Sequence, residues 1–198
     1  MIDADLIQRC QKEEEDAFDE LYKVLGKKAL WTAYLISGRR DVAEDILQEA
    51  FFECFRDIKK LRRPEVFPVW FNRILIRKCW HMVGKEKKTA ADSLSDSMKE
   101  QVDSGIDITE VVEANEASRF VRNAIGRLKP EMRTVIILYY YNGLSIKEIA
   151  EVMKCFQGTV KSRLHYAKKE LEKELKGSFG SGSFERVRYL GKECAIHE

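Results

Sequence analysis

Residues 144–175 contain two short runs of apolar residues, separated by a turn of about three or four residues. Apolar residues that recur every three or four positions bury one face of an amphipathic helix. The first run consists of Ile146, Ile149, Ala150 and Met153, and the second of Val160, Leu164, Ala167 and Leu171. This pattern predicts a helix-turn-helix and excludes a sheet for this part of the chain.

Helical spacing also governs the first half of the chain. It predicts a short helix over residues 4–13 and a long one that begins near Phe18. A further helix is expected to begin with Asp41 as its N-cap and to end before Pro64, and another to begin near Phe67. The residues expected to be buried in these last two helices are Leu47, Ala50, Phe51, Cys54, Phe55 and Ile58, followed by Trp70, Phe71, Ile74, Leu75, Cys79 and Met82.

Turn signals mark the helices of the second half. Helical patterning resumes at Val111, and Pro130 suits the first turn of a helix that runs to Tyr141. Ser145 followed by Glu148 forms a capping box for the next helix. Because the chain has only three prolines and little of the alternation typical of strands, we predict an all-α fold.

Four segments differ in pattern and composition. Residues 1–88 and 113–176 are predicted to be two small helical domains, joined by a flexible acidic linker over residues 89–112. The linker is rich in Ser and Asp and has no sustained helical period. Residues 177–198 begin with a run of Gly and Ser and are predicted to be a flexible tail.

The net charge of +2 conceals an alternation along the chain. Residues 61–88 carry 8 basic and 2 acidic residues and residues 119–176 carry 13 and 6, whereas residues 89–118 carry 1 and 8. Two separate basic blocks in a helical protein indicate two surfaces that bind polyanions. Charge alone leaves an alternative open, which is that the basic helices are merely solvated faces.

No pattern in the sequence is typical of an enzyme or a metal site. Phosphate-binding loops, His-Glu-x-x-His helices and Gly-rich strand-to-helix turns are all absent, so we expect neither catalysis, nor a cofactor, nor a bound metal. Three of the five cysteines lie in apolar stripes, which is typical of buried thiols in a reducing cytosol. Because no apolar run approaches about 20 residues and no secretory start is visible, we expect a cytoplasmic protein with no membrane insertion of its own.

The second helix of the predicted helix-turn-helix carries polar and basic residues outside its core stripe. In such a motif this helix enters the major groove of DNA, with its first residues at base edges and flanking cations on phosphates. The residues expected to bind DNA are Gly158, Thr159, Lys161, Ser162, Arg163, His165 and Tyr166. Paired helices also occur in proteins that never meet DNA, and a stand-alone transcriptional regulator that binds operator DNA is an alternative function.

The stretch from Leu128 to Leu175 resembles region four of the extracytoplasmic-function sigma factors of bacterial RNA polymerase. The family pattern, "LP-x-x-x-R-x-V", then "GLS-x-x-E-I-A-E", then "GTVKSRLHRARK-x-L", is matched by Leu128, Pro130, Arg133 and Val135, by residues 143–145 and 148–151, and by residues 158–165. The resemblance implies that this domain reads the −35 promoter element through its second helix. Lys154 stands where a turn glycine is usual, and Phe156 stands where a capping serine is usual.

The first domain resembles region two of the same family. Residues 17–22 match its "AF-x-x-L-Y" helix, and residues 41–52, DVAEDILQEAFF, match its "D-x-EDL-x-QE-x-F" helix. In the family the latter helix docks on the clamp helices of the largest subunit of core RNA polymerase, which implies the same partner here. The residues carried over are Asp45, Leu47, Gln48, Glu49 and Phe51. The alternative for Leu47 and Phe51 is a place in the core.

Residues 67–88 resemble the family's helix that binds and opens the −10 element. The residues expected to act there are Arg62, Arg63, Asn72, Arg73, Arg77, Trp80 and His81, of which the first two lie in the loop that matches the family's specificity loop. Cations can hold the phosphates of an opened strand, and the ring of Trp80 can stack on an unpaired base. Partial burial of Trp80 is the alternative. Arg77 and His81 replace the Asn and Asp of the family pattern.

Taken as a whole, the resemblance implies a factor for promoter-specific transcription initiation, with core RNA polymerase and promoter DNA as partners. It implies no cofactor, because the polymerase makes the phosphodiester bonds. It also implies an anti-sigma factor as a further partner. The acidic linker is implied to thread the positively charged cleft of the polymerase, although a soluble spacer fits its composition equally well.

Overall fold

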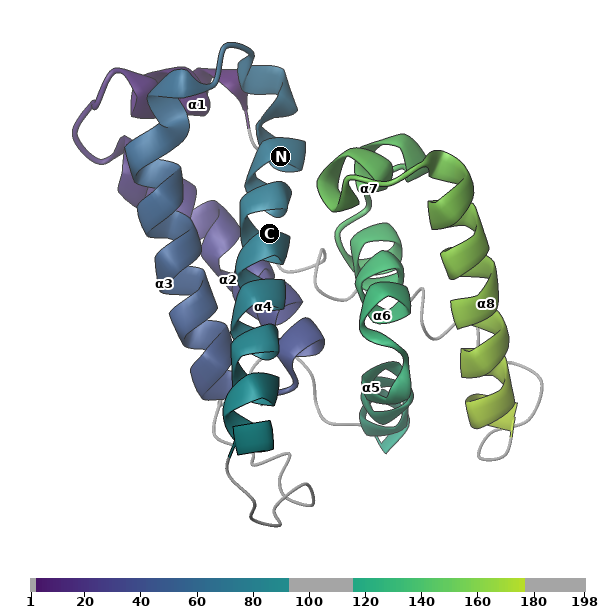
Figure 1. Cartoon of the computed structure of the whole chain (residues 1–198). Coiled ribbons are helices and arrows are strands. Elements are labelled where there is room, and N and C mark those ends of the chain that lie inside the picture. The colour runs from purple at the N-terminus through teal and green to yellow at the C-terminus, as the bar shows by residue number, and fades with distance from the viewer. Residues whose placement is uncertain (1–2, 93–115, 177–198) are drawn as a thin grey trace. The chain divides into compact units, whose positions relative to one another are not determined.

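The computed structural model describes residues 3–92 and 116–176, and the chain divides into two compact units between residues 101 and 102 (Figure 1). Every regular element in the described ranges is helical, so the all-α prediction is confirmed. None of these helices combines the length and the apolar content that a membrane crossing requires. The predicted linker beyond residue 92 and the predicted tail lie outside the described residues.

Three long helices build the first unit. They are α2 (Ala17–Ser37), α3 (Arg40–Asp57) and α4 (Phe67–Asp92), and each packs against the other two. Figure 1 shows α3 and α4 running side by side. Gly38 ends α2 because it adopts a left-handed conformation, with φ of 79°, that an L side chain rarely takes. α4 continues past residue 88, where the sequence predicted the domain to end.

A short helix and two 3-10 turns close one end of this unit. α1 (Ala4–Gln11) packs on α2 and on the turns η1 (Ile58–Lys60) and η2 (Pro64–Val66), which join α3 to α4. The side chain of Gln11 fastens the contact, since its Nε2 donates to the carbonyl oxygens of Ile58 at 3.0 Å and Leu61 at 2.6 Å. Ile58 O also accepts from Leu61 N at 3.1 Å, so the bonds of Gln11 join α1 to the turn that follows α3.

Aromatic rings fill the centre of the first unit. Phe51, Phe67 and Phe71 are buried, and the ring centroid of Phe71 lies 5.1 Å from that of Phe51 and 5.8 Å from that of Phe67. Ring pairs at these distances stabilise the fold beyond the area that they bury. Cys54 on α3 and Cys79 on α4 are buried as the sequence predicted, and burial raises the pKa of both thiols to about 12.

The beginning of α3 differs from the prediction. The helix starts at Arg40 with Arg39 at the N-cap position, so the prediction that Asp41 is the N-cap is wrong. Asp41 lies in the first turn, where the Nε of Arg39 donates to its Oδ1 at 3.2 Å. That hydrogen bond lowers the pKa of the Asp41 carboxyl. A carboxylate in a first turn is still favourable, because it faces the positive end of the helix dipole.

In α3 and α4, three residues that the sequence assigned to the core are not buried. Phe55 is 55% exposed, although its ring lies edge-on to that of Phe18 with the centroids 5.0 Å apart. Trp70 and Met82 are only half-buried. A helix in a three-helix unit buries the arc that faces its two neighbours, so residues at the margin of an apolar stripe reach solvent.

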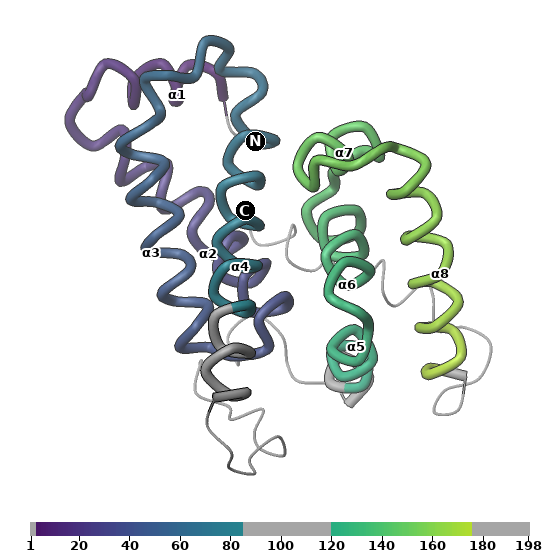
Figure 2. Tube along the Cα trace, viewed as in Figure 1, coloured from purple at the N-terminus to yellow at the C-terminus, as the bar shows by residue number. Residues whose placement is uncertain are grey.

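The second unit contains the helix-turn-helix. Its elements are α5 (Glu116–Arg127), α6 (Pro130–Ile136), the π-helical turn η4 (Ile137–Tyr141), α7 (Ile146–Met153) and α8 (Gln157–Lys176). α8 packs against α5, α6 and α7, and Figure 2 traces the sharp turn of the backbone from α7 into α8. Pro130 begins α6 as predicted, but the last turn of the predicted helix widens to a π-helix, with Asn142 N donating to Ile137 O at 3.0 Å.

Local bonding at the turn explains how α7 begins and ends. Ser145 and Glu148 form the predicted capping box, in which Ser145 N donates to Glu148 Oε2 at 2.7 Å and Glu148 N donates to Ser145 Oγ at 3.3 Å. Lys154 ends α7 in the left-handed conformation, with φ of 50° and ψ of 49°. The lysine therefore takes the backbone conformation for which glycine is usual.

Candidate nucleic-acid interface

The core stripe of the helix-turn-helix is almost entirely as predicted. Val160, Leu164, Ala167 and Leu171 of α8 and Ile149, Ala150 and Met153 of α7 are buried, whereas Ile146 is only half-buried. Burial of this stripe fixes the rotation of α8 and leaves its opposite face in solvent. Of the residues expected to bind DNA, those exposed are Gly158, Lys161, Ser162, His165 and Tyr166, and those half-buried are Thr159 and Arg163.

The cations at the start of α8 remain available to a polyanion. No described residue forms an ion pair with Lys161 or Arg163. Farther along, Lys168 lies over the rings of Tyr139 and Tyr140 at 5.9 and 5.4 Å from their centroids, which is a cation–π contact with η4. Sequence reasoning did not find this contact, because it depends on how the π-helical turn packs against α8.

The first residues of α8 leave room for a close approach. A Cβ atom added to Gly158 would meet nothing within 4 Å, so the glycine is not required by packing. The carbonyl of Phe156 accepts hydrogen bonds from Thr159 N at 2.9 Å and Val160 N at 3.2 Å, which places Phe156 at the N-cap position. Its side chain has no atom that can cap the helix.

The residues expected to act on the −10 element lie in α4 and in the loop before it. Arg62, Arg63, Arg77, Trp80 and His81 are exposed, while Asn72 and Arg73 are half-buried. The Nδ2 of Asn72 donates to Pro68 O at 2.8 Å, so part of its bonding capacity is used within α4. The Nε of Arg73 is buried and has no hydrogen-bond partner among the described residues.

Trp80 is 37% exposed, so part of its side chain is buried and part reaches solvent. The partial burial that the sequence left open is therefore observed, and stacking of Trp80 on an unpaired base stays a prediction.

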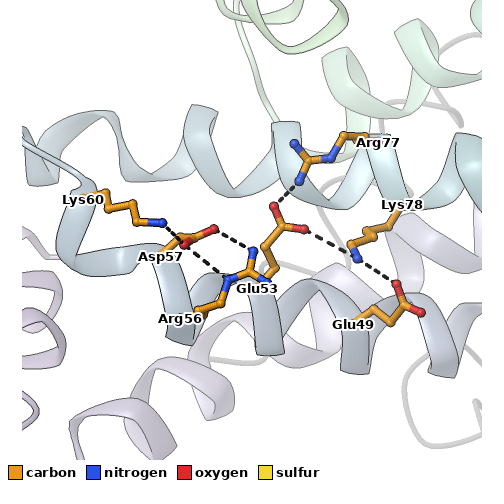
Figure 3. A network of polar contacts seen from close by, with 7 residues as sticks. All are labelled: Glu49, Glu53, Arg56, Asp57, Lys60, Arg77 and Lys78. Atoms are coloured by element: carbon orange, nitrogen blue, oxygen red, sulfur yellow. Dashed lines mark hydrogen bonds and ion pairs between the residues drawn. The ribbon is translucent and has the colours of Figure 1, made fainter.

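Acidic residues of α3 hold two of the α4 cations (Figure 3). Glu53, whose side chain is only 15% exposed, pairs with Arg77 and lies 3.5 Å from Lys78 Nζ. Lys78 also reaches Glu49, at 2.7 Å. The same face of α3 continues into a second cluster, where Arg56 and Lys60 hold the pKa of the Asp57 carboxyl below its usual range. Arg77 is therefore exposed but partly neutralised.

The candidate polymerase-docking surface on α3 is smaller than predicted on its apolar side. Asp45, Gln48 and Glu49 are exposed, but Leu47 and Phe51 are each only 5% exposed and belong to the core of the unit. Their burial favours the alternative of a place in the core and leaves little of either side chain exposed to a partner.

Phe52 is the apolar residue on this surface that sequence reasoning missed. It is 69% exposed and lies one helical turn after Gln48. The spacing of the buried stripe contained the signal, because Phe52 falls outside that stripe and directly beside the exposed acidic residues. The apolar part of the surface is thus Phe52, with Gln48 and Glu49 beside it.

Nothing in the described ranges suggests a metal centre. No group of three or more His, Cys, Asp or Glu side chains within residues 3–92 and 116–176 is arranged to hold an ion.

Comparisons with known proteins give a family match for each of the two units. The family model described as Sigma-70 region 2 matches residues 21–89, and the model described as Sigma-70, region 4 matches residues 121–171. These ranges contain α4 up to residue 89 and the whole helix-turn-helix up to residue 171.

Curated relatives extend over both units. The chain is 29% identical over 177 residues to the ECF RNA polymerase sigma factor SigW of Bacillus subtilis, covering 86% of this chain and 95% of that protein. It is 28% identical over 184 residues to the ECF RNA polymerase sigma-E factor of Haemophilus influenzae, covering 88% and 96%.

A solved structure has the same fold. It is the co-crystal structure of the sigma factor RpoE in complex with the anti-sigma factor NepR from Bartonella quintana, with a TM-score of 0.66 at 20% identity, covering 83% of this chain and 100% of that one. Two family models in the expected order, relatives matched over nearly their full length and a shared fold all agree. The chain therefore belongs to the extracytoplasmic-function sigma factors of RNA polymerase.

Proposed function

We propose that this sigma factor directs transcription initiation by holding two promoter elements while it is bound to core RNA polymerase. The observation that carries the proposal is the exposed face of α8, where Lys161 and Ser162 lie opposite a buried stripe and no described residue pairs with Lys161. Such a face fits the major groove of the −35 element, with short side chains at base edges and cations at phosphates.

The second element is the −10 region, held along α4. Exposed cations of the preceding loop, Arg62 and Arg63, can bind phosphates, and Trp80 can accept an unstacked base. Strand separation requires several kcal/mol, which captured bases and phosphate contacts would offset. The chain itself would carry out no bond chemistry, because the polymerase makes the RNA.

The partner surface for core polymerase is the exposed side of α3. Asp45, Gln48 and Glu49 supply polar contacts, and Phe52 supplies an apolar anchor one helical turn after Gln48. Aromatic anchors with a polar rim are typical of protein interfaces that are formed and released. An anti-sigma factor is a further partner in this proposal, by analogy with the Bartonella quintana sigma factor that was solved bound to one.

Transcription with purified core polymerase tests this proposal. The full chain plus core polymerase is expected to start RNA at discrete sites on a promoter library, whereas the chain alone is expected to bind the same promoters weakly in a band-shift assay. A stand-alone regulator would do the reverse, binding unaided and directing no start site. That second result would overturn the proposal.

A pair of variants tests the docking surface separately. Phe52→Ala is expected to weaken binding to core polymerase about tenfold or more, as truncating a central aromatic anchor costs about 2 kcal/mol. Val24→Ala is the matched control, because Val24 is 45% exposed on α2 and outside the proposed surface. Equal affinity for core polymerase in both variants would remove Phe52 from the interface.

A further inference from the structure

Phe156 is the most exposed large apolar side chain that the structure describes, at 86%. It stands between α7 and α8, where its carbonyl accepts the first hydrogen bonds of α8 from Thr159 and Val160. The residue therefore sits at the beginning of the helix proposed to enter the major groove.

A phenylalanine at this position contradicts two local preferences, which are a polar side chain at an N-cap and burial of a large apolar side chain. An N-cap residue is normally Ser, Thr, Asp or Asn, since its side chain then accepts a hydrogen bond from the helix. The neighbouring α7 follows this rule with the capping box of Ser145, whereas α8 has a phenyl ring at the same position. The ring also stays in water, because no described ring or cation is in contact with it. Local rules that are broken without compensation mark functional positions.

The chemistry of the major groove indicates what such a ring can contact. Base edges there present hydrogen-bond donors and acceptors, and the one apolar group among them is the 5-methyl group of thymine. Phenylalanine is a side chain that makes this contact, and the first residues of a recognition helix are those that reach base edges. Next to the ring, Gly158 has no side chain and open space around it, which permits the helix end to come close.

We propose that Phe156 is a specificity-determining residue that contacts the 5-methyl group of a thymine in the −35 element. The inference rests on the proposed function of α8, and it adds a contact that the polar residues of that helix cannot make. Lys161 and Ser162 can bind phosphates or polar base edges, but neither distinguishes thymine from uracil.

Replacing thymine by uracil tests the contact directly, since it removes only the methyl group. Holoenzyme made from the full chain and core polymerase first selects a promoter from a library with a random −35 region, and each thymine of the selected −35 element is then replaced by uracil. At one thymine, wild-type holoenzyme is expected to lose about fourfold in promoter affinity, the effect of exposing one buried methyl. Phe156→Ser is expected to bind the thymine and uracil promoters equally, and Phe156→Leu to keep part of the difference.

The serine variant also controls for folding. Serine is a good N-cap, so Phe156→Ser is expected to melt at a temperature equal to or above that of the wild-type chain, and its loss of discrimination cannot come from unfolding.

Two negative results have different meanings. If the wild-type holoenzyme depends on the −35 element but every uracil replacement is silent, or if the selected element has no thymine, the methyl contact is wrong and the proposed function stands. The same holds if Phe156→Ser still discriminates. If the holoenzyme shows no dependence on the −35 element at all, both proposals fail.

Discussion

The two basic helices of this protein carry similar charge in the sequence and differ in how much of it is available. On α4, Arg77 and Lys78 are engaged by Glu53 and Glu49 of α3. On α8, no described residue pairs with Lys161 or Arg163. A count of basic residues does not distinguish the two blocks. It contains no information on the acidic residues of α3 that pack against α4.

The difference suggests two modes of holding DNA. The start of α8 can attract phosphates at long range, since Lys161 is exposed, Arg163 is half-buried and neither is paired with a described residue. The α4 surface has part of its charge neutralised within the unit, and Arg63 of the preceding loop lies 3.7 Å from Glu65. The affinity of this surface must therefore come more from the ring of Trp80 and from the loop cation Arg62. We therefore expect charge removal to matter most on α8, and ring removal to matter most on α4.

The largest effect is expected from the cations of α8. Lys161→Ala combined with Arg163→Ala should reduce transcription from a −35-dependent promoter about 100-fold, because each lost contact to a base or phosphate is worth roughly 1–3 kcal/mol. Run-off transcription with saturating core polymerase measures it. Lys173→Ala is the control, as Lys173 is exposed near the other end of the same helix. Equal transcription from the double variant and the control would show that the unpaired cations of α8 do not hold the promoter.

On α4, truncating the ring should affect strand opening more than duplex binding. Trp80→Ala is expected to lower the fraction of open complex about tenfold, since a stacked base is worth about 1–3 kcal/mol, while binding to closed promoter DNA stays nearly unchanged. Permanganate reactivity of unpaired thymines measures opening, and footprinting measures binding. Trp80→Phe, which keeps a ring, should retain most of the opening. A parallel loss of opening and binding in Trp80→Ala would exclude a stacking role.

Local patterns in the sequence predicted much of this architecture. The helices, the capping box of Ser145 and the buried stripe of α8 follow from spacings of a few residues, and such short-range signals are readable in one sequence. The exposed residues of the α8 face follow from the same stripe, because they are its complement.

Features that depend on packing between helices were not readable. Glu53 and Arg77 are 24 residues apart in the chain, so nothing local links them. Phe55 and Phe51 both lie in the apolar stripe of α3, and only the placement of α2 and α4 decides that Phe51 is buried while Phe55 is exposed. The same placement buries Phe51 and leaves Phe52 exposed, and for this reason we propose Phe52 as the contact residue.

A smaller effect is expected from the ion pair between Glu53 and Arg77, which makes α4 differ from α8 in available charge. Glu53→Gln should lower the free energy of unfolding by about 1 kcal/mol, because a mostly covered carboxylate that holds two cations is lost. It should also raise the affinity for heparin and steepen its salt dependence, since Arg77 loses its acidic partner while Lys78 keeps Glu49. Urea denaturation and heparin chromatography measure the two changes. Glu44→Gln is the control, because it breaks only the exposed pair with Arg40. If heparin affinity does not change, α4 and α8 do not differ in available charge.

The smallest effect is expected at the turn that aims α8. Lys154 holds a left-handed conformation, which costs an L residue roughly 1–2 kcal/mol, and glycine regains part of this at the expense of its own chain entropy. Lys154→Gly should therefore raise the free energy of unfolding of the second unit by only about 0.5 kcal/mol. Thermal denaturation measures that gain, and run-off transcription is expected to be unchanged because the turn keeps its shape. If Lys154→Gly is stabilised but loses −35-dependent output, the Lys154 ammonium binds a phosphate, and the available charge of this unit extends from α8 into the turn.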